Sequence, residues 1–368
     1  MKTVIRQIAV CVLVAVAVYA AAPKPAPAPA RWLGLIGEYG ADNEILYILE
    51  KDGQLCASFK RVTPEPLREV SRDVFVFATS GPHAKQRLTF TRDRRDRATQ
   101  VKLDNTTLER RRIEPEAGAN QLRVPPVRPV PELIKEALAA QPPVESGHFR
   151  QPDLVELIKL DPAIRLDVRY ATTNNLFGTV FYSEPRAFLQ RPAAESLVRV
   201  NRKLNPLGYG LLVHDAYRPW YVTKVFWDAT PEDKKLFVAD PSKGSRHNRG
   251  CAVDLTLYDL KTKKPIEMVS TYDETTDRAY PDYPGGTSLQ RWHRDLLRAA
   301  MEAAGFKVYP AEWWHFDFND WQKYPILNIR FDQITPKALA NLSPGFERSE
   351  NPGALTQPHI NPERVRLV

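Results

Sequence analysis

Two short segments of the chain carry the residue types that bind a zinc ion and activate a water molecule. The first runs from Ser245 to Asp254 and contains His247, and the second runs from Glu312 to His315. A catalytic zinc site needs three protein ligands, a fourth position for water and a carboxylate that takes a proton from that water. We take His247, Asp254 and His315 as the candidate ligands and Glu312 as the candidate base. The sequence therefore predicts a zinc-dependent hydrolase with one ion per chain.

Both segments are expected to lie in a β-sheet, which would hold the ligands in fixed positions. Residues 251–257 alternate between two faces, so that Asp254 leaves one face of a strand and its apolar neighbours leave the other. The same alternation from Trp313 to Phe318 places His315 on a second strand. A single His and Asp pair at this spacing is more often a hydrogen-bonded core pair. The combination of both segments is what favours a metal site.

Four stretches of the chain, in this order, resemble the D-alanyl-D-alanine dipeptidases, a family of zinc DD-peptidases. The stretches are Asp167-Val-Arg-Tyr-Ala-Thr-Thr-Asn-Asn175, Asp215-Ala-Tyr-Arg-Pro219, Ser245 to Leu257 and Glu312-Trp-Trp-His315. The resemblance covers about residues 146–340 and assigns the same three zinc ligands and the same base. It implies a hedgehog/DD-peptidase-like fold for this part of the chain, with a mainly antiparallel sheet flanked by helices.

The resemblance also implies three further roles. Arg218 would polarise the scissile carbonyl and stabilise its oxyanion, as a guanidinium in a dry pocket can. Asp273 would receive the free amine of a dipeptide, and Ser245 would contact the substrate. The alternative for Arg218 is a structural ion pair with Asp215. The alternative for Asp273 is a place in a solvated acidic loop that has no part in selecting the substrate.

These residues predict a zinc metallopeptidase that hydrolyses D-Ala-D-Ala or related D-dipeptides, in cell-wall turnover or in glycopeptide resistance. Two alternatives remain open. One is a DD-carboxypeptidase that trims longer stem peptides, and the other is a non-catalytic protein that binds the cell wall. Glu312 and Arg218 favour an enzyme, because a binding protein has no need for a base. Asp273 favours a dipeptidase, because a fixed carboxylate would pair with a free amine.

The N-terminus is typical of an exported protein. Residues 1–6 carry positive charges, and an apolar run from Ile8 to Ala22 follows, so that residues 1–22 are expected to form a secretory signal. We expect a periplasmic or extracellular location, with an uncleaved membrane anchor as the alternative. Of the three cysteines, Cys56 and Cys251 remain after the signal, and two thiols in different domains do not make a disulfide framework.

A length of 368 residues suggests two domains, and the predicted fold class is α+β with a small all-β domain in front. The expected divisions are a Pro- and Ala-rich spacer at 23–31, a small β-barrel-like domain at 32–115, a Pro-rich linker at 116–146, the dipeptidase domain at 147–340 and a C-terminal tail at 341–368. In the all-β part, an Asp52-Gly53 turn is expected to join two strands.

Helices are expected at 192–204 and at 288–304, the second with Trp292, Leu296, Ala299 and Ala303 as its apolar stripe. The net charge is +8, and arginines gather at 92–97 and 110–112. Solvated turns are one explanation for these arginines. The other is attraction to an anionic envelope polymer, and nothing in the chain resembles a nucleic-acid module. The sequence does not indicate an oligomeric state.

Overall fold

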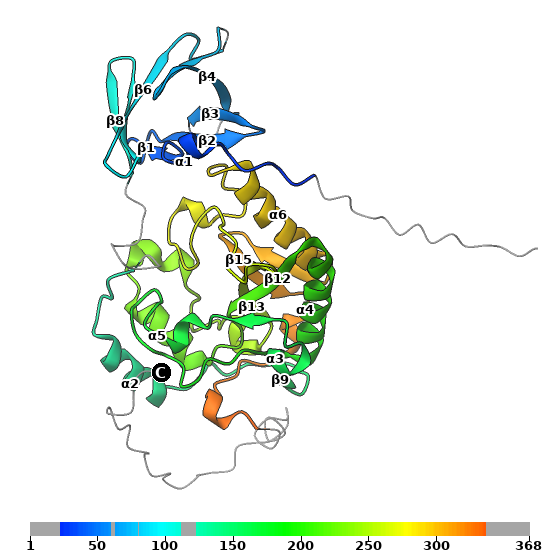
Figure 1. The fold of residues 1–368 in the computed structure, drawn as a ribbon. Helices are drawn as coiled ribbons and strands as arrows, with labels where there is room; N and C mark the ends of the chain where they lie inside the picture. The colour runs from blue at the N-terminus through cyan, green and yellow to red at the C-terminus, as the bar shows by residue number, and fades with distance from the viewer. Residues whose placement is uncertain (1–22, 60–62, 80, 112–122, 336–368) are drawn as a thin grey trace, which may run out of the picture.

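The computed structural model describes residues 23–59, 63–79, 81–111 and 123–335 (Figure 1). The expected signal at 1–22 and the expected tail at 341–368 lie outside the described residues and stay predictions. Among the described helices, none combines the length and the apolar character that a membrane span requires. The described chain forms an N-terminal all-β part and a larger part of mixed helices and strands, which agrees with the predicted α+β class.

Eight strands of the N-terminal part form one antiparallel sheet in which sequential strands are neighbours. They are β1 (Gly37–Tyr39), β2 (Leu46–Lys51), β3 (Gln54–Phe59), β4 (Glu65–Ser71), β5 (Val74–Phe77), β6 (Arg87–Arg92), β7 (Ala98–Leu103) and β8 (Thr106–Glu109). A bridge between Tyr39 and Arg110 joins the first strand to the end of the last, and Gly40 N donates to Glu109 O at 2.9 Å. These contacts bring the two edges together and nearly close a barrel.

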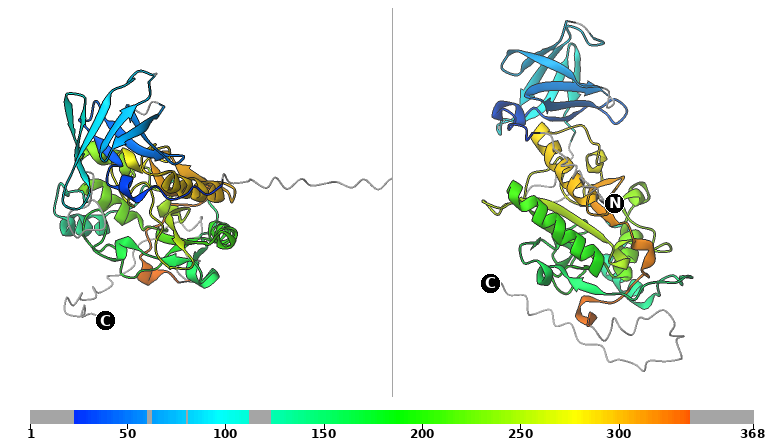
Figure 2. Two further views of the ribbon diagram at one scale, coloured as in Figure 1. Left: turned by 45° about the horizontal axis from the view of Figure 1, so that its top comes forward. Right: turned by 90° about the vertical axis from the view of Figure 1, so that its right-hand side faces the viewer.

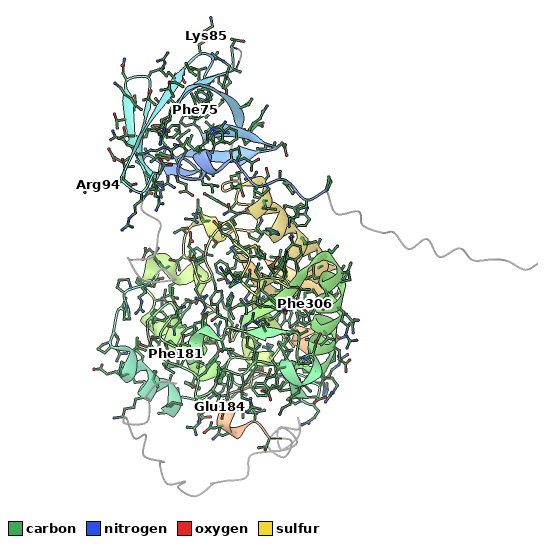
Figure 3. The ribbon with its side chains drawn as sticks, in the orientation of Figure 1. Phe75, Lys85, Arg94, Phe181, Glu184 and Phe306 are labelled. Carbon is green, nitrogen blue, oxygen red and sulfur yellow. The ribbon has the colours of Figure 1, made fainter. Side chains whose placement is uncertain are left out.

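Local sequence accounts for much of this sheet. The turn predicted at Asp52 and Gly53 joins β2 to β3, and both residues have positive φ, at 51° and 79°, as a type I′ hairpin turn requires. The interior of the barrel is apolar, and Figure 3 shows Phe75 within it. Its largest buried side chains are Leu35, Tyr39, Leu46, Ile48, Leu55, Phe75, Phe77, Leu88 and Phe90. We call this closed sheet, residues 32–111, the barrel.

The second part is built on a five-stranded sheet with the order β10-β12-β13-β15-β14. Its strands are β10 (Arg165–Leu166), β12 (Tyr209–Asp215), β13 (Ala252–Asp259), β14 (Phe306–Tyr309) and β15 (Glu312–Phe318). Only the edge pair β10 and β12 is parallel among these, so the sheet is mainly antiparallel, as expected. A separate antiparallel pair consists of β9 (Leu154–Glu156) and β11 (Phe188–Gln190).

Helices cover this sheet, with the longest two beside each other in Figures 1 and 2. The described helices are α1 (Ala30–Leu33), α2 (Val130–Ala139), α3 (Leu157–Leu160), α4 (Arg191–Leu204), α5 (Trp220–Ala229) and α6 (Ser288–Glu302). Thr287 begins α6 with a capping box that it shares with Gln290. Half of the predicted stripe of α6 is confirmed, because Leu296 is buried and Trp292 packs against the core, whereas Ala299 and Ala303 are exposed. Leu297, Ala300 and Met301 complete the buried row.

Candidate active site

Three neighbouring strands bring acidic and imidazole side chains into one row. Asp215 on β12 pairs with Asp254 on β13, and Asp254 pairs with His315 on β15. Directly paired residues of adjacent strands leave the same face of a sheet, so these three side chains lie side by side. The alternation predicted for residues 251–257 and 313–318 is therefore confirmed, and it places Asp254 and His315 together.

His247 reaches the row from a short turn of 3₁₀ helix, η4 (His247–Arg249), just before β13. The turn ends at Gly250, which has φ +65° and a left-handed conformation. A Cβ at this position would collide with the side chain of Leu154, so the reversal requires glycine. The three predicted ligands thus converge, each of them buried.

The facing atoms of the three side chains have the spacing of metal ligands. His247 Nε2 lies 3.3 Å from Asp254 Oδ1, His315 Nδ1 lies 3.0 Å from the same oxygen, and the two nitrogens are 3.2 Å apart. Ligands about 2.0–2.1 Å from a tetrahedral ion are about 3.3 Å from one another. Asp254 Oδ1 is buried and has no hydrogen-bond partner, although both imidazoles are close to it. The row therefore leaves a buried acceptor that a cation would satisfy.

The outer nitrogen of each imidazole explains why the inner atoms need a cation. His247 Nδ1 is 2.6 Å from the carbonyl oxygen of Ala216, and His315 Nε2 is 2.9 Å from Asp317 Oδ1. Both partners only accept, so each outer nitrogen carries the hydrogen, and each inner nitrogen of a neutral ring is an acceptor. Three acceptors then face one another. Such outer partners orient metal ligands, and the residues present fit a divalent ion.

Asp254 is held in place by Tyr272, a residue that the sequence did not indicate. Tyr272 donates its hydroxyl to Asp254 Oδ2 at 3.1 Å, and its ring stacks on His214 at 4.7 Å. Asp317 was also missed as a partner of His315, although its place two residues after His315 on a strand puts both on one face. No comparable local signal pointed to Tyr272, which comes from the loop after β13.

Glu312 lies beside the three candidate ligands but is not one of the side chains whose atoms converge. It begins β15, and its Oε2 is 3.6 Å from His315 Nδ1. Its side chain is 13% exposed, and burial raises the pKa of Glu312 to about 8. The charge of a cation bound at the adjacent ligands would favour the carboxylate form and oppose this rise. The position suits a base that faces a water molecule at the ion.

Arg218 forms the ion pair with Asp215 that was one of its two predicted roles, and it lies beside the candidate ligands. Its Nε and Nη2 lie 2.9 and 2.8 Å from Asp215 Oδ2, so the ion pair with Asp215 is present. The guanidinium also packs 5.2 Å from the ring centre of Tyr170 and 4.9 Å from that of Phe226. Its Nη2 is 3.7 Å from Asp254 Oδ2. The ion pair fixes the arginine beside the ligands.

A cavity of about 330 Å³ opens over these residues. Arg218, Glu312 and the three candidate ligands line it, together with both of the substrate residues expected from the sequence, Ser245 and Asp273. Ser245 Oγ accepts from His247 N at 3.2 Å. Asp273 is half-buried, and Tyr170 donates to its two carboxylate oxygens at 2.8 and 3.1 Å. Its place in the wall of the cavity disagrees with a wholly solvated loop.

Comparison with known proteins agrees with this arrangement. The model of the peptidase M15 family, described as D-ala-D-ala dipeptidase, matches residues 150–334. The D-alanyl-D-alanine dipeptidase of Escherichia coli K12 is 32% identical over 179 residues, which cover 49% of this chain and 91% of that protein. The D-alanyl-D-alanine dipeptidase of Enterococcus faecium is 35% identical over 187 residues, 46% of this chain and 91% of that protein. The family match begins after the barrel.

Proposed function

The chain belongs to the D-Ala-D-Ala dipeptidase family of M15 peptidases, and from this premise we propose that it hydrolyses D-alanyl-D-alanine or a related D-dipeptide at a zinc ion. His247, Asp254 and His315 would hold the ion. The proposal is supported most by the convergence of three buried acceptor atoms beside the carboxylate of Glu312, at one wall of a cavity. The same wall in a protein that only binds peptides would need neither the base nor the ion.

A zinc ion held by these ligands would polarise the scissile carbonyl and lower the pKa of a water molecule to about 7. Glu312 would accept a proton from the attacking water and return it to the leaving amine, as one general acid–base group can. Arg218 donates hydrogen bonds to the carbonyl oxygen as negative charge grows on it. Asp215 keeps the guanidinium oriented for this, so that little rearrangement is needed during the reaction.

The cavity also suits a small substrate that carries two charges. A free dipeptide is a zwitterion, with an ammonium group at one end and a carboxylate at the other. Asp273 offers a negative charge at the wall of the cavity, and three basic side chains besides Arg218 line it. These are Lys235, Lys243 and Arg246. A cavity of about 330 Å³ is near the lower end of the size of small-molecule sites.

We predict one zinc ion per chain in the purified protein. His315→Ala should abolish zinc binding, because it removes one of three ligands and leaves Asp254 Oδ1 without its cation. Elemental analysis after dialysis against a weak chelator measures the zinc, and the thermal midpoint measures the stability that binding adds. His148→Ala, at an exposed position, is the control. Full zinc content in folded His315→Ala would show that the ligand set is wrong.

We predict that Asp273 makes the enzyme prefer a free dipeptide. An N-acetylated substrate has no ammonium group, so Asp273 would lose a charged partner, while its hydrogen bond from Tyr170 remains. We expect kcat/KM for D-Ala-D-Ala to exceed that for N-acetyl-D-Ala-D-Ala by about a hundredfold, because a site built for a charged group strongly rejects an analogue that lacks it. Asp273→Asn should remove most of that ratio. Asp277→Asn, an exposed acid in the same loop, should not.

The same assay addresses the carboxypeptidase alternative. If the wild type cleaves the terminal D-Ala of a stem pentapeptide as well as it cleaves the dipeptide, Asp273 does not select substrates by their free ammonium group. The enzyme would then be a DD-carboxypeptidase with the same zinc ligands and the same base.

A further inference from the structure

The barrel packs directly on the segment that carries Asp273. This segment, residues 268–287, joins the region of β13 to α6, and we call it the selectivity loop. Figures 1 and 2 show the barrel seated over α6 and the chain before it. Tyr47, Leu49 and Cys56 of the barrel belong to the same buried apolar cluster as Val269 and Tyr283 of the loop. The two parts therefore share a core at this contact.

A buried carboxylate of the barrel fixes the start of α6. Glu50, on β2, is 1% exposed and accepts a hydrogen bond from Ser288 N at 2.7 Å. Its backbone nitrogen donates to Gly286 O at 3.1 Å, and its carbonyl oxygen accepts from Arg291 at 2.6 Å. A carboxylate at a helix N-terminus also interacts favourably with the helix dipole. The end of the selectivity loop is thereby held by a strand of the barrel.

A second buried carboxylate of the barrel holds the middle of the loop. Glu38, on β1, is 5% exposed and accepts from the hydroxyl of Tyr283 at 2.7 Å. Within the loop, Arg278 donates to the carbonyl oxygen of Val269 at 3.0 Å and lies 3.4 Å from Glu274 Oε1. Val269 and Glu274 flank the turn that presents Asp273. The barrel thus holds Tyr283, and Arg278 ties Val269 to Glu274 on either side of the turn, while Val269 and Tyr283 share the buried apolar cluster with the barrel.

The backbone of this turn needs such support. Asp273 has φ +59°, a left-handed conformation that costs a residue with a Cβ about 1 kcal/mol or more. Tyr272, the residue before it, holds Asp254. A shift of the turn would therefore move both a proposed substrate contact and the partner of a proposed metal ligand.

We propose that the barrel is a fixed part of the active site and that Glu38 and Glu50 are positioning residues for the selectivity loop. The proposal rests on the function proposed above for Asp273. It differs from a barrel that is tethered beside the enzyme and only recruits it to a polymer. Glu38 and Glu50 each have a donor within the barrel, Arg111 and Gly53, and each accepts a further hydrogen bond from the other part, from Tyr283 and Ser288. A tethered module would not bury two carboxylates in a contact of this kind, because each buried acceptor that loses a hydrogen bond costs free energy.

The barrel lies outside the part of the chain that the family model and the relatives match. The family model begins at residue 150, and the Escherichia coli relative is covered over 91% of its length by the part that matches. The barrel thus has no counterpart in the matched region. Interfaces between domains of one chain are mobile by default unless they are large and apolar. Here a shared apolar core and two buried carboxylates make the contact a rigid one.

The test compares Tyr283→Phe and Glu38→Gln with Glu69→Gln in the full-length protein. Glu69 is a barrel acid whose ion pair with Arg31 is exposed, so it serves as a matched control away from the contact. Hydrogen exchange of the peptides that span residues 268–287 is measured first. Tyr283→Phe removes the buried hydrogen bond and Glu38→Gln replaces its charged acceptor by a weaker neutral one, and either change, about 1 kcal/mol, should speed exchange there about fivefold. Exchange in β12 and β13 should stay unchanged.

The second readout is the ratio of kcat/KM for D-Ala-D-Ala to that for its N-acetyl form, at full zinc content. We expect the ratio to fall about fivefold in Tyr283→Phe and Glu38→Gln, and to keep its wild-type value in Glu69→Gln. A variant that only loses global stability would lower the thermal midpoint and leave the ratio intact. That outcome, or unchanged exchange in the loop, would overturn the proposal. A wild type inactive on the dipeptide would instead refute the proposed function, and the exchange result would still decide the role of the barrel.

Discussion

Glu312→Gln is expected to keep one zinc ion per chain and to lower kcat by about 10²- to 10⁴-fold, the usual contribution of a general acid–base group. The amide has the shape of the carboxylate, so the contact near His315 Nδ1 survives. It cannot take a proton from water, and it cannot return one to the leaving amine. The affinity for substrate should change little, because the carboxylate is not among the groups assigned to hold the dipeptide.

The measurement is single-turnover hydrolysis of D-Ala-D-Ala, with zinc determined on the same sample. Glu302→Gln, on the exposed side of α6, is a suitable control for the chemical change. A rate close to that of the wild type, with zinc bound, would show that another group accepts the proton. Zinc loss in Glu312→Gln would instead assign this residue to the ligands.

Arg218 is expected to show the second large effect, with Arg218→Lys nearly as impaired as Arg218→Ala. Loss of one oxyanion donor lowers kcat by about 10²- to 10³-fold. A lysine ammonium cannot bind Asp215 and aim a second donor at the carbonyl in the way that a planar guanidinium can. The rings of Tyr170 and Phe226 also pack on a flat group, which lysine lacks.

Stability must be separated from rate in these two variants. Arg218→Ala leaves Asp215 buried without its cation, a change that costs about 3–5 kcal/mol for a buried pair. We therefore specify rates per folded molecule, with the folded fraction taken from denaturant unfolding. If both variants lose stability but keep the wild-type rate per folded molecule, Arg218 acts only as the structural partner of Asp215. If Arg218→Lys kept most of the wild-type rate while Arg218→Ala lost it, a positive charge alone would suffice at this position.

The parts of the fold that could be predicted depend on neighbours in the sequence. Alternation along residues 251–257 and 313–318 was enough to predict strands and to place Asp254 and His315 on them, and Asp52-Gly53 was enough to predict a turn. The closure of the barrel was harder, because it joins Tyr39 to Arg110 across seventy-one positions of the chain. The strands β1, β4 and β8 are short or largely exposed, and their sequences lack a clear apolar alternation.

Two features were not predicted correctly, the contact of Tyr272 with Asp254 and the buried face of α6. Tyr272 was not found because its contact with Asp254 depends on the path of a loop rather than on a periodic pattern. In α6 the apolar stripe was correct at Leu296 but was continued through Ala299, while the buried row also includes Leu297 and Met301. The helix also buries His293 and Arg294, which a search for apolar residues excludes. His293 Nε2 shares a hydrogen bond of 3.0 Å with the hydroxyl of Tyr209, and Arg294 donates to the carbonyl oxygen of Tyr283 at 2.8 Å.

The cross-strand row of Asp215, Asp254 and His315 has a consequence for folding. Side chains in a strand alternate between faces, so a slip of one residue between β13 and β15 would send His315 to the opposite side of the sheet from Asp254. Only the native pairing of these two strands would therefore bring the ligands together and bind the metal tightly. Zinc present during folding would stabilise that pairing over every slipped one by its binding free energy. The ion would select the native register of the sheet as well as serve its chemistry.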